Sequence, residues 1–259
     1  MRAIWEGSIS FGLVNIPIKL YSAVQKKELK FRYLHKSCKT PLQYLKFCPN
    51  CKREVGADEI AFGYEYEKDK FVLLDDSDFS KVPIKTTKTI DIFNFIKLEE
   101  IDPIYFEKAY YLIPKEESLK AYALLQQALN FTNKVAIGKV VLRKKEKLVA
   151  IRPYSRVLLM ETLYYHDEIR SLESFNFNPI DAELRDEELK MAIELINALT
   201  IKFEPESYKD NYREALLDLI AAKIEGREVK EIKEEVEKAK DLMEALKISV
   251  ELAKKKDAH

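Results

Sequence analysis

The chain has 259 residues, of which 47% are hydrophobic and 34% are charged, and its 44 lysines and arginines balance 44 aspartates and glutamates. This composition predicts one or two globular domains with a sizeable core and excludes a disordered chain. No apolar run approaches the ~20 residues that span a bilayer, and residues 1–13 lack the apolar stretch of a secretory leader. The sequence therefore predicts a cytoplasmic protein with no membrane partner.

The charges are distributed unevenly along the chain. Residues 1–160 hold 28 basic and 19 acidic side chains, whereas residues 161–259 hold 16 basic and 25 acidic ones. The first part thus carries a net charge of +9 and the second part −9. This separation predicts a basic working surface for nucleic acid and an acidic part that faces protein or solvent.

Short strands dominate the first part of the chain. Alternating apolar residues from Ser8 to Val24 predict a strand with a kink at 15–17, because Pro17 cannot donate to a central ladder. One helix is expected from Ser118 to Asn130. So many strands around a single helix predict an antiparallel β-barrel. The further strands are expected at 64–67, 70–74, 89–96, 105–113, 135–143, 147–152 and 157–163.

Residues 26–53 combine metal-ligand spacing with positive charge. They contain His35-x-x-Cys38 and Cys48-x-x-Cys51, which include all three cysteines of the chain. Two such pairs joined by a short hairpin suit a tetrahedral zinc ribbon, because each pair turns two donors toward one point. We therefore expect these four residues to bind zinc. The alternative is a buried Cys38 thiol beside a redox-active or chance pair of cysteines.

Basic residues surround this expected zinc site, and Glu28 is the only acid within 26–53. A second basic group lies on and between the strands expected at 135–143 and 147–152. Any single one of these residues could simply lie in a turn exposed to solvent, without a binding role. Together they are typical of a surface that binds phosphates. The expected DNA-binding residues are Arg32, Lys36, Lys39, Lys46, Lys52, Arg53, Lys139, Arg143, Lys144, Lys145 and Lys147.

Helices replace strands after residue 185, so the fold class is mainly β with a helical C-terminal part (α+β). Asp186 is expected to cap one helix, and another is expected to begin at Pro205 and end at Gly226. From Val229 to Ala253, apolar residues alternate at spacings of three and four. This spacing predicts either a coiled-coil seam or an amphipathic helix on its own barrel. The expected domains are 1–185 with a bridging insertion at about 25–75, 186–226, and 227–259.

Motifs for catalysis are absent from the sequence, which has no GxxxxGK[ST], no GxGxxG and no HExxH. Asp75, Asp76 and Asp78 could hold a divalent metal as in a nuclease, but no catalytic motif accompanies them. A third interpretation is a zinc ribbon that binds other proteins. We therefore expect a binding protein without catalytic residues rather than an enzyme.

Several long stretches resemble one family. They are MRAIWEGSISFGLVNIPIKLYSA at 1–23, GYEYEKDKFVLL at 63–74, EIDPIYFEKAYYLIP at 100–114, KVAIGKVVLR at 134–143, and residues 193–223. In this order they are similar to prokaryotic Ku, the DNA-end-binding protein of non-homologous end joining. The resemblance covers about residues 1–225, without the large von Willebrand-like domain of the eukaryotic subunits.

This resemblance implies a homodimer whose barrels and bridging arms form a ring around double-stranded DNA ends, independently of base sequence. It implies that the helices at about 186–226 embrace the partner subunit. It also implies recruitment of an ATP-dependent DNA ligase by a protein associated with the nucleoid. Residues 227–259 depart from the family pattern, because they form a mixed-charge heptad segment and not the long lysine-rich extension of many bacterial members. Ligase docking there is a hypothesis.

Overall fold

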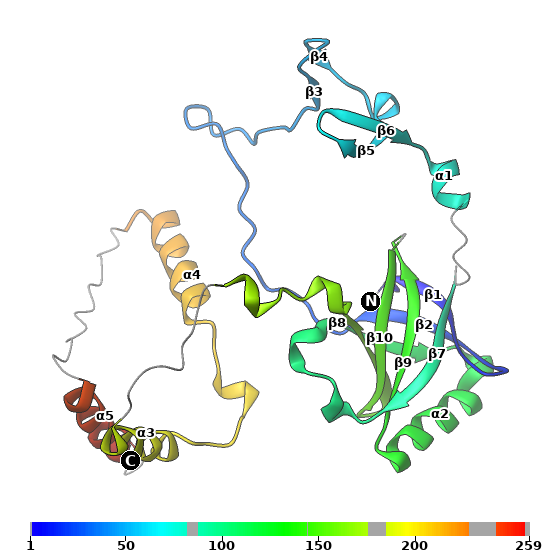
Figure 1. Cartoon of the computed structure of the whole chain (residues 1–259). Coiled ribbons are helices and arrows are strands. Elements are labelled where there is room, and N and C mark those ends of the chain that lie inside the picture. Colours follow the sequence, from blue (N-terminus) through cyan, green and yellow to red (C-terminus); the bar gives the residue numbers. More distant parts are fainter. Residues whose placement is uncertain (1, 82–87, 144, 176–184, 228–241, 257–259) are drawn as a thin grey trace. The chain divides into compact units, whose positions relative to one another are not determined.

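The computed structural model describes residues 2–81, 88–143, 145–175, 185–227 and 242–256 (Figure 1). The chain divides into two compact units, Met1–Ser174 and Phe175–His259. The first unit contains a β-barrel, and the described part of the second is mainly helical. This arrangement confirms the expected α+β class. No helix in the described ranges is long and apolar enough to cross a membrane.

Seven strands close into a barrel in the order β1-β2-β8-β11-β10-β9-β7. Neighbouring strands are antiparallel except β1 and β7, which are parallel, so the expected wholly antiparallel barrel is wrong. The chain leaves β2 and returns at β7 on the same end of the barrel, and β7 therefore runs in the direction of β1. The strands are β1 (Trp5–Phe11), β2 (Val14–Ser22), β7 (Thr89–Ile96), β8 (Phe106–Pro114), β9 (Val135–Leu142), β10 (Lys145–Tyr154) and β11 (Val157–Leu163).

The first expected strand is in fact the β1–β2 hairpin. Its turn contains Gly12, whose φ of 59° suits a residue without a Cβ, and Ile9 pairs with Ile16 across the hairpin. The kink expected at 15–17 is therefore wrong. Pro17 lies in the ladder opposite a β1 residue, and its carbonyl accepts a hydrogen bond of 2.6 Å from the Ser118 hydroxyl. Ser118 precedes the helix as expected, but its hydroxyl does not cap it.

Helix α2 (Leu119–Thr132) closes one end of the barrel, which we call the closed end (Figure 1). Three of its apolar side chains are buried in the barrel core. Among them, the Tyr122 hydroxyl donates to the Leu112 carbonyl at 2.6 Å and accepts from the Leu158 N–H at 2.6 Å. Leu112 and Leu158 are paired residues of β8 and β11. One phenol therefore joins the helix to two barrel strands.

The opposite end, which we call the arm end, is where β2 ends and β7 begins. Residues 23–88 lie between these strands, and we call them the arm. The arm contains β3 (Phe47–Cys48) paired with β4 (Arg53–Glu54), β5 (Phe62–Glu67) paired with β6 (Lys70–Leu74), and α1 (Asp76–Lys81).

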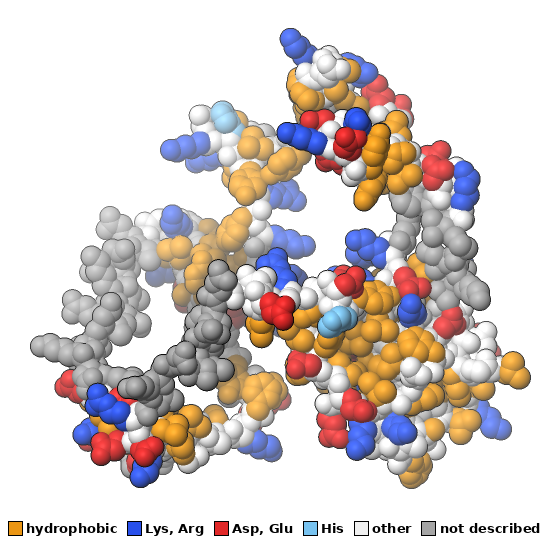
Figure 2. All heavy atoms as spheres, viewed as in Figure 1, with side chains coloured by type: hydrophobic (Ala, Val, Ile, Leu, Met, Phe, Trp, Pro, Cys, Tyr) orange, Lys and Arg blue, Asp and Glu red, His pale blue; other side chains and the backbone are white. Residues whose placement is uncertain are grey.

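The arm exposes many large apolar side chains, which are visible on its surface in Figure 2. Both faces of the β5–β6 hairpin are open, since every residue of β5 is exposed. None of the arm's described residues belongs to the buried core. The part of the arm that the structure describes therefore lacks a hydrophobic core of its own. The most exposed of its aromatic residues are Phe31, Tyr33, Tyr44, Phe47, Phe62, Tyr64 and Tyr66.

The second unit contains three described α-helices, α3 (Asp186–Ala198), α4 (Asn211–Ile224) and α5 (Leu242–Lys256). Helix α3 begins at Asp186, so its N-cap residue is Arg185 and not Asp186 as expected. Pro205 opens a short 3₁₀ turn instead of α4, whose cap is Asp210. Helix α5 packs against α3. Residues 228–241 of the expected heptad segment lie outside the described residues, and the described remainder, α5, lies on α3.

Candidate nucleic-acid interface

Basic side chains gather at the arm end of the barrel. The turn between β9 and β10 lies at this end, because β9 runs antiparallel to β7 and therefore ends where β7 begins. The turn presents Arg143 and Lys145, both exposed, and Arg143 adopts a left-handed backbone conformation with a φ of 51°. Lys144 lies outside the described residues. The barrel thus offers cations at the end from which the arm leaves.

Three of the expected DNA-binding residues already have acidic partners. Lys139 lies 2.8 Å from Glu146, and Arg53 lies 2.5 Å from Glu59. The hydrogen bond that Lys139 donates to Glu146 raises the pKa of Lys139, and the bonds that Arg53 donates to Glu59 raise the pKa of Arg53. The third residue, Lys147, pairs with Glu107. Exposed pairs of this kind contribute little to stability, so a phosphate could replace the carboxylate, but the net positive charge at these positions is reduced.

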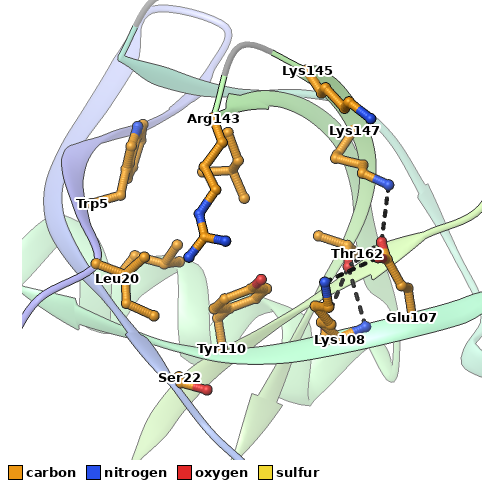
Figure 3. Close-up of a pocket in the computed structure, with 12 residues that line it drawn as sticks. Trp5, Leu20, Ser22, Glu107, Lys108, Tyr110, Arg143, Lys145, Lys147 and Thr162 are labelled. Atoms are coloured by element: carbon orange, nitrogen blue, oxygen red, sulfur yellow. Dashed lines mark hydrogen bonds and ion pairs between the residues drawn. The ribbon is translucent and has the colours of Figure 1, made fainter. Parts of the chain in front are cut away.

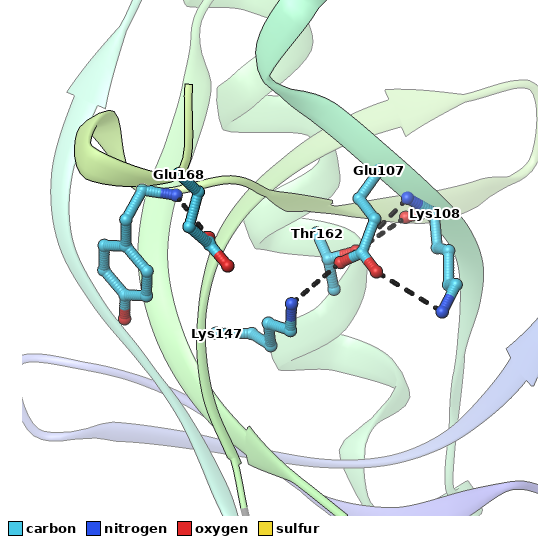
Figure 4. A network of polar contacts seen from close by, with 6 residues as sticks. Glu107, Lys108, Lys147, Thr162 and Glu168 are labelled. Carbon is cyan, nitrogen blue, oxygen red and sulfur yellow. Dashed lines mark hydrogen bonds and ion pairs between the residues drawn. The ribbon is translucent and has the colours of Figure 1, made fainter. Parts of the chain in front are cut away.

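Lys147 belongs to a small polar network on the barrel (Figure 4). Its ammonium group lies 3.0 Å from a Glu107 oxygen, and Lys108 lies 3.3 Å from the other oxygen. The Thr162 hydroxyl lies 3.3 Å from Glu107. Burial of Glu107 opposes its ionisation, but the bonds from Lys147 and Lys108 outweigh this effect and hold the pKa of Glu107 below its usual value. Glu107 is thus an ionised anchor for two lysines.

The sequence interpretation missed Glu107 and Lys108 as part of this basic surface. They lie 40 and 39 positions before Lys147 in the chain, and barrel closure brings them together. The strand pattern at 105–113 gave no signal for this contact, since it does not specify which strand pairs with which.

The arm presents its cations on two tight turns. In the first, the His35 N–H donates to the Thr40 carbonyl at 2.9 Å, and the Lys39 N–H donates to the His35 carbonyl at 2.7 Å. Lys36 and Lys39 therefore lie at the tip of this turn. In the second, Lys52 has a φ of 50° in the turn between β3 and β4.

Seven expected DNA-binding residues are exposed and have no acidic partner within the described ranges. They occupy the arm and the barrel turn at the arm end. Such unpaired, solvated cations are the ones that can exchange counterions for phosphate oxygens. These residues are Arg32, Lys36, Lys39, Lys46, Lys52, Arg143 and Lys145.

The expected zinc donors lie in the same two turns. His35 Nδ1 lies 3.0 Å from Cys38 Sγ, and the Cys51 N–H points to Cys48 Sγ at 3.4 Å. Hydrogen bonds from Thr40 and His35 lower the pKa of the Cys38 thiol to about 7. Each pair is therefore brought together, and its imidazole and thiol groups suit zinc. Within the described ranges, however, no three potential metal ligands converge.

In the acidic cluster at 75–78, the Asp75 carboxylate binds backbone N–H groups. The Asp75 carboxylate accepts hydrogen bonds from the N–H groups of Ser77 and Asp78 at 2.8 and 3.0 Å. A hydrogen bond from the Ser77 side chain, followed by these backbone bonds, lowers the pKa of Asp75. Asp78 in turn pairs with Lys81 at 3.1 Å. This pattern is that of a capped helix start, which weakens the interpretation of the cluster as a nuclease centre.

A closed barrel with a basic end and a long cationic arm defines the class of protein, a β-barrel module with a positively charged surface. Residues 10–191 match the family model described as the Ku70/Ku80 beta-barrel domain. The chain belongs to this Ku family, and the resemblance noted in its sequence is confirmed.

Three relatives bear the name "Non-homologous end joining protein Ku". The chain is 48% identical to the one from Symbiobacterium thermophilum, over 98% of this chain and 63% of that relative. It is 45% identical to the one from Archaeoglobus fulgidus, over 98% of this chain and 100% of the relative. It is 44% identical to the one from Heliobacterium modesticaldum, over 98% of this chain and 93% of that relative. The chain thus spans less than two thirds of the first relative and nearly all of the other two.

Proposed function

We propose that the protein binds double-stranded DNA ends, independently of sequence and without catalysis, in non-homologous end joining on the cytoplasmic nucleoid. The observation that carries this proposal is the set of seven exposed, unpaired cations on the arm and at the arm end of the barrel. Contacts from lysine and arginine to phosphates supply affinity without reading bases. The family and the names of the relatives support the pathway.

We propose that the working form is a homodimeric ring. The support is the apolar surface of the arm, which includes Tyr44 with 82% of its surface exposed, and of the second unit, where Phe203 and Tyr212 are 71% and 78% exposed. Monomers rarely leave apolar surface of this extent uncovered, and a second copy would cover it with symmetric contacts. A closed ring can load only where a duplex ends, which gives preference for ends without base contacts.

End binding is tested by a gel-shift competition at fixed salt. A labelled linear duplex of a few tens of base pairs is challenged with equal masses of linear or covalently closed circular DNA. We expect only the linear competitor to displace the protein, because a ring cannot thread onto a closed circle. Equal competition by both forms would contradict the proposal and favour a general basic binder or a zinc-ribbon adaptor. Loss of the labelled DNA with magnesium would instead favour a nuclease.

We propose that His35, Cys38, Cys48 and Cys51 hold one zinc ion that stiffens the arm, which lacks a core. The support is the two-pair spacing and the donor chemistry. Elemental analysis of purified protein should find about one zinc per chain, and replacing Cys48 and Cys51 with serine should remove it. A chain that carries no zinc after purification in zinc-containing medium would overturn this proposal.

We propose that the segment 227–259 contributes to recruitment of an ATP-dependent DNA ligase. The apolar heptad positions of this segment support a docking role. Deleting residues 227–259 should abolish stimulation of the ligase while sparing end binding, as measured by joining of linear DNA and by gel shift on the same samples. Unchanged stimulation would place the docking surface elsewhere on the chain.

A further inference from the structure

A cavity of about 560 Å³ opens at the arm end of the barrel. Its walls come from the start of β1, the end of β2, the start of β8, the turn between β9 and β10, and the end of β11. Figure 3 shows Trp5 and Tyr110 on two sides of this space, with Leu20 between them at the base. The volume lies in the range of about 300–1,000 Å³ that is typical of small-molecule sites.

The cavity has an excess of positive charge. Four cations line it, Lys108, Arg143, Lys145 and Lys147, and Glu107 is the only acid among the lining residues. Glu107 already contacts Lys147 at 3.0 Å and Lys108 at 3.3 Å. One carboxylate cannot balance four cations, so the cavity favours an anionic ligand.

Arg143 is the cation best placed to receive such a ligand. Figure 3 shows its guanidinium group directed into the cavity, toward Tyr110 and Leu20. Within the described ranges it makes no ion pair. A guanidinium group can donate two parallel hydrogen bonds to one phosphate, which makes it more selective for phosphate than a lysine.

We propose that this cavity binds a nucleotide, with the phosphate on Arg143 and the planar base against Trp5 and Tyr110. Aromatic side chains stack on any base, and cations at the rim neutralise the phosphate. Lys145 supplies that rim charge. The nucleotide is either free in solution or the terminal nucleotide of a DNA strand, because both present the same ring and phosphate. The inference goes beyond end binding, and its first test uses no DNA.

Trp5 is the only tryptophan of the chain and lines this cavity, so a ligand that binds there should change its fluorescence. Deoxyadenosine monophosphate is titrated into the full-length protein, with deoxyadenosine and inorganic phosphate as partial ligands. We expect a saturable fluorescence change with the nucleotide, and binding at least about tenfold weaker for either partial ligand. Calorimetry on the same samples gives an independent affinity. Absence of both a fluorescence change and binding heat would overturn the proposal.

Replacing Arg143 with alanine should weaken nucleotide binding by about tenfold or more, because a charge-assisted hydrogen bond is lost. Lys145→Ala should weaken it less. The matched control is Arg156→Ala, an exposed arginine in the turn between β10 and β11 at the closed end, for which we expect unchanged binding. An Arg143→Ala chain that keeps the parental melting temperature and the parental nucleotide affinity would contradict the inference.

The two sources of the nucleotide are separated by adding a linear duplex. If the cavity takes the terminal nucleotide, the duplex alone should change Trp5 fluorescence, and deoxyadenosine monophosphate should compete with it. If the cavity takes a free nucleotide, both ligands should bind together. A failure of nucleotide binding would leave the linear-against-circular competition unchanged, so the two proposals fail independently.

Discussion

Replacing Lys36 and Lys39 together with glutamate is expected to weaken binding to a linear duplex and to flatten its salt dependence by about one unit of slope per lost phosphate contact. Both lysines lie at the tip of the 35–40 turn, are exposed, and have no acidic partner within the described ranges. Their charge is therefore available to phosphate. Affinities measured at several salt concentrations give the slope directly.

The matched control for this variant changes the same amount of charge at the closed end. Lys120 on α2 and Lys134 just before β9 are both exposed, and the double replacement Lys120→Glu and Lys134→Glu should leave the slope unchanged. If the Lys36 and Lys39 variant keeps the parental slope, the DNA path lies elsewhere. If the slope of the salt dependence decreases equally in both variants, the cause is the change in net charge and not the loss of phosphate contacts by the arm.

Replacing Tyr122 with phenylalanine is expected to lower the free energy of unfolding of the barrel by about 1–3 kcal/mol, because two buried backbone groups lose their partner. These groups are the Leu112 carbonyl and the Leu158 N–H, each 2.6 Å from the phenolic oxygen. For a unit of this size, about 1 kcal/mol lowers the melting temperature by roughly 2–4 °C. Thermal unfolding followed by Trp5 fluorescence measures the change in the barrel itself.

Tyr111→Phe provides the control for this second variant. Tyr111 lies on β8 beside Leu112, and its ring stacks on Tyr154 with centroids 6.3 Å apart. Its hydroxyl makes no hydrogen bond within the described ranges, so its removal should change the melting temperature little. Equal melting temperatures for the Tyr122→Phe chain and the parent would show that the phenol does not stabilise the seam between β8 and β11.

Local pattern was sufficient for many elements of the fold. The runs at 89–96 and 157–163 match β7 and β11 to the residue, since β-branched and apolar side chains continue to the strand ends. The expected helix at 118–130 is α2 shifted by one or two residues. The pattern failed at the β1–β2 hairpin, because the apolar alternation continues across the turn and only the positive φ at Gly12 marks it.

Sequence by itself determined the family, the helical C-terminal part, the strand-rich core, and the position of the basic residues and of the histidine and cysteine pairs. Each of these depends on residues close together in the chain. Only the tertiary structure decided which cations are paired. Lys147 meets Glu107 from a strand 40 positions away, and Arg143 reaches the same cavity as Trp5. Barrel closure joins strand ends that are distant in sequence, and no local periodicity specifies that order. The electrostatics of the arm end therefore follow from strand pairing and not from charge spacing.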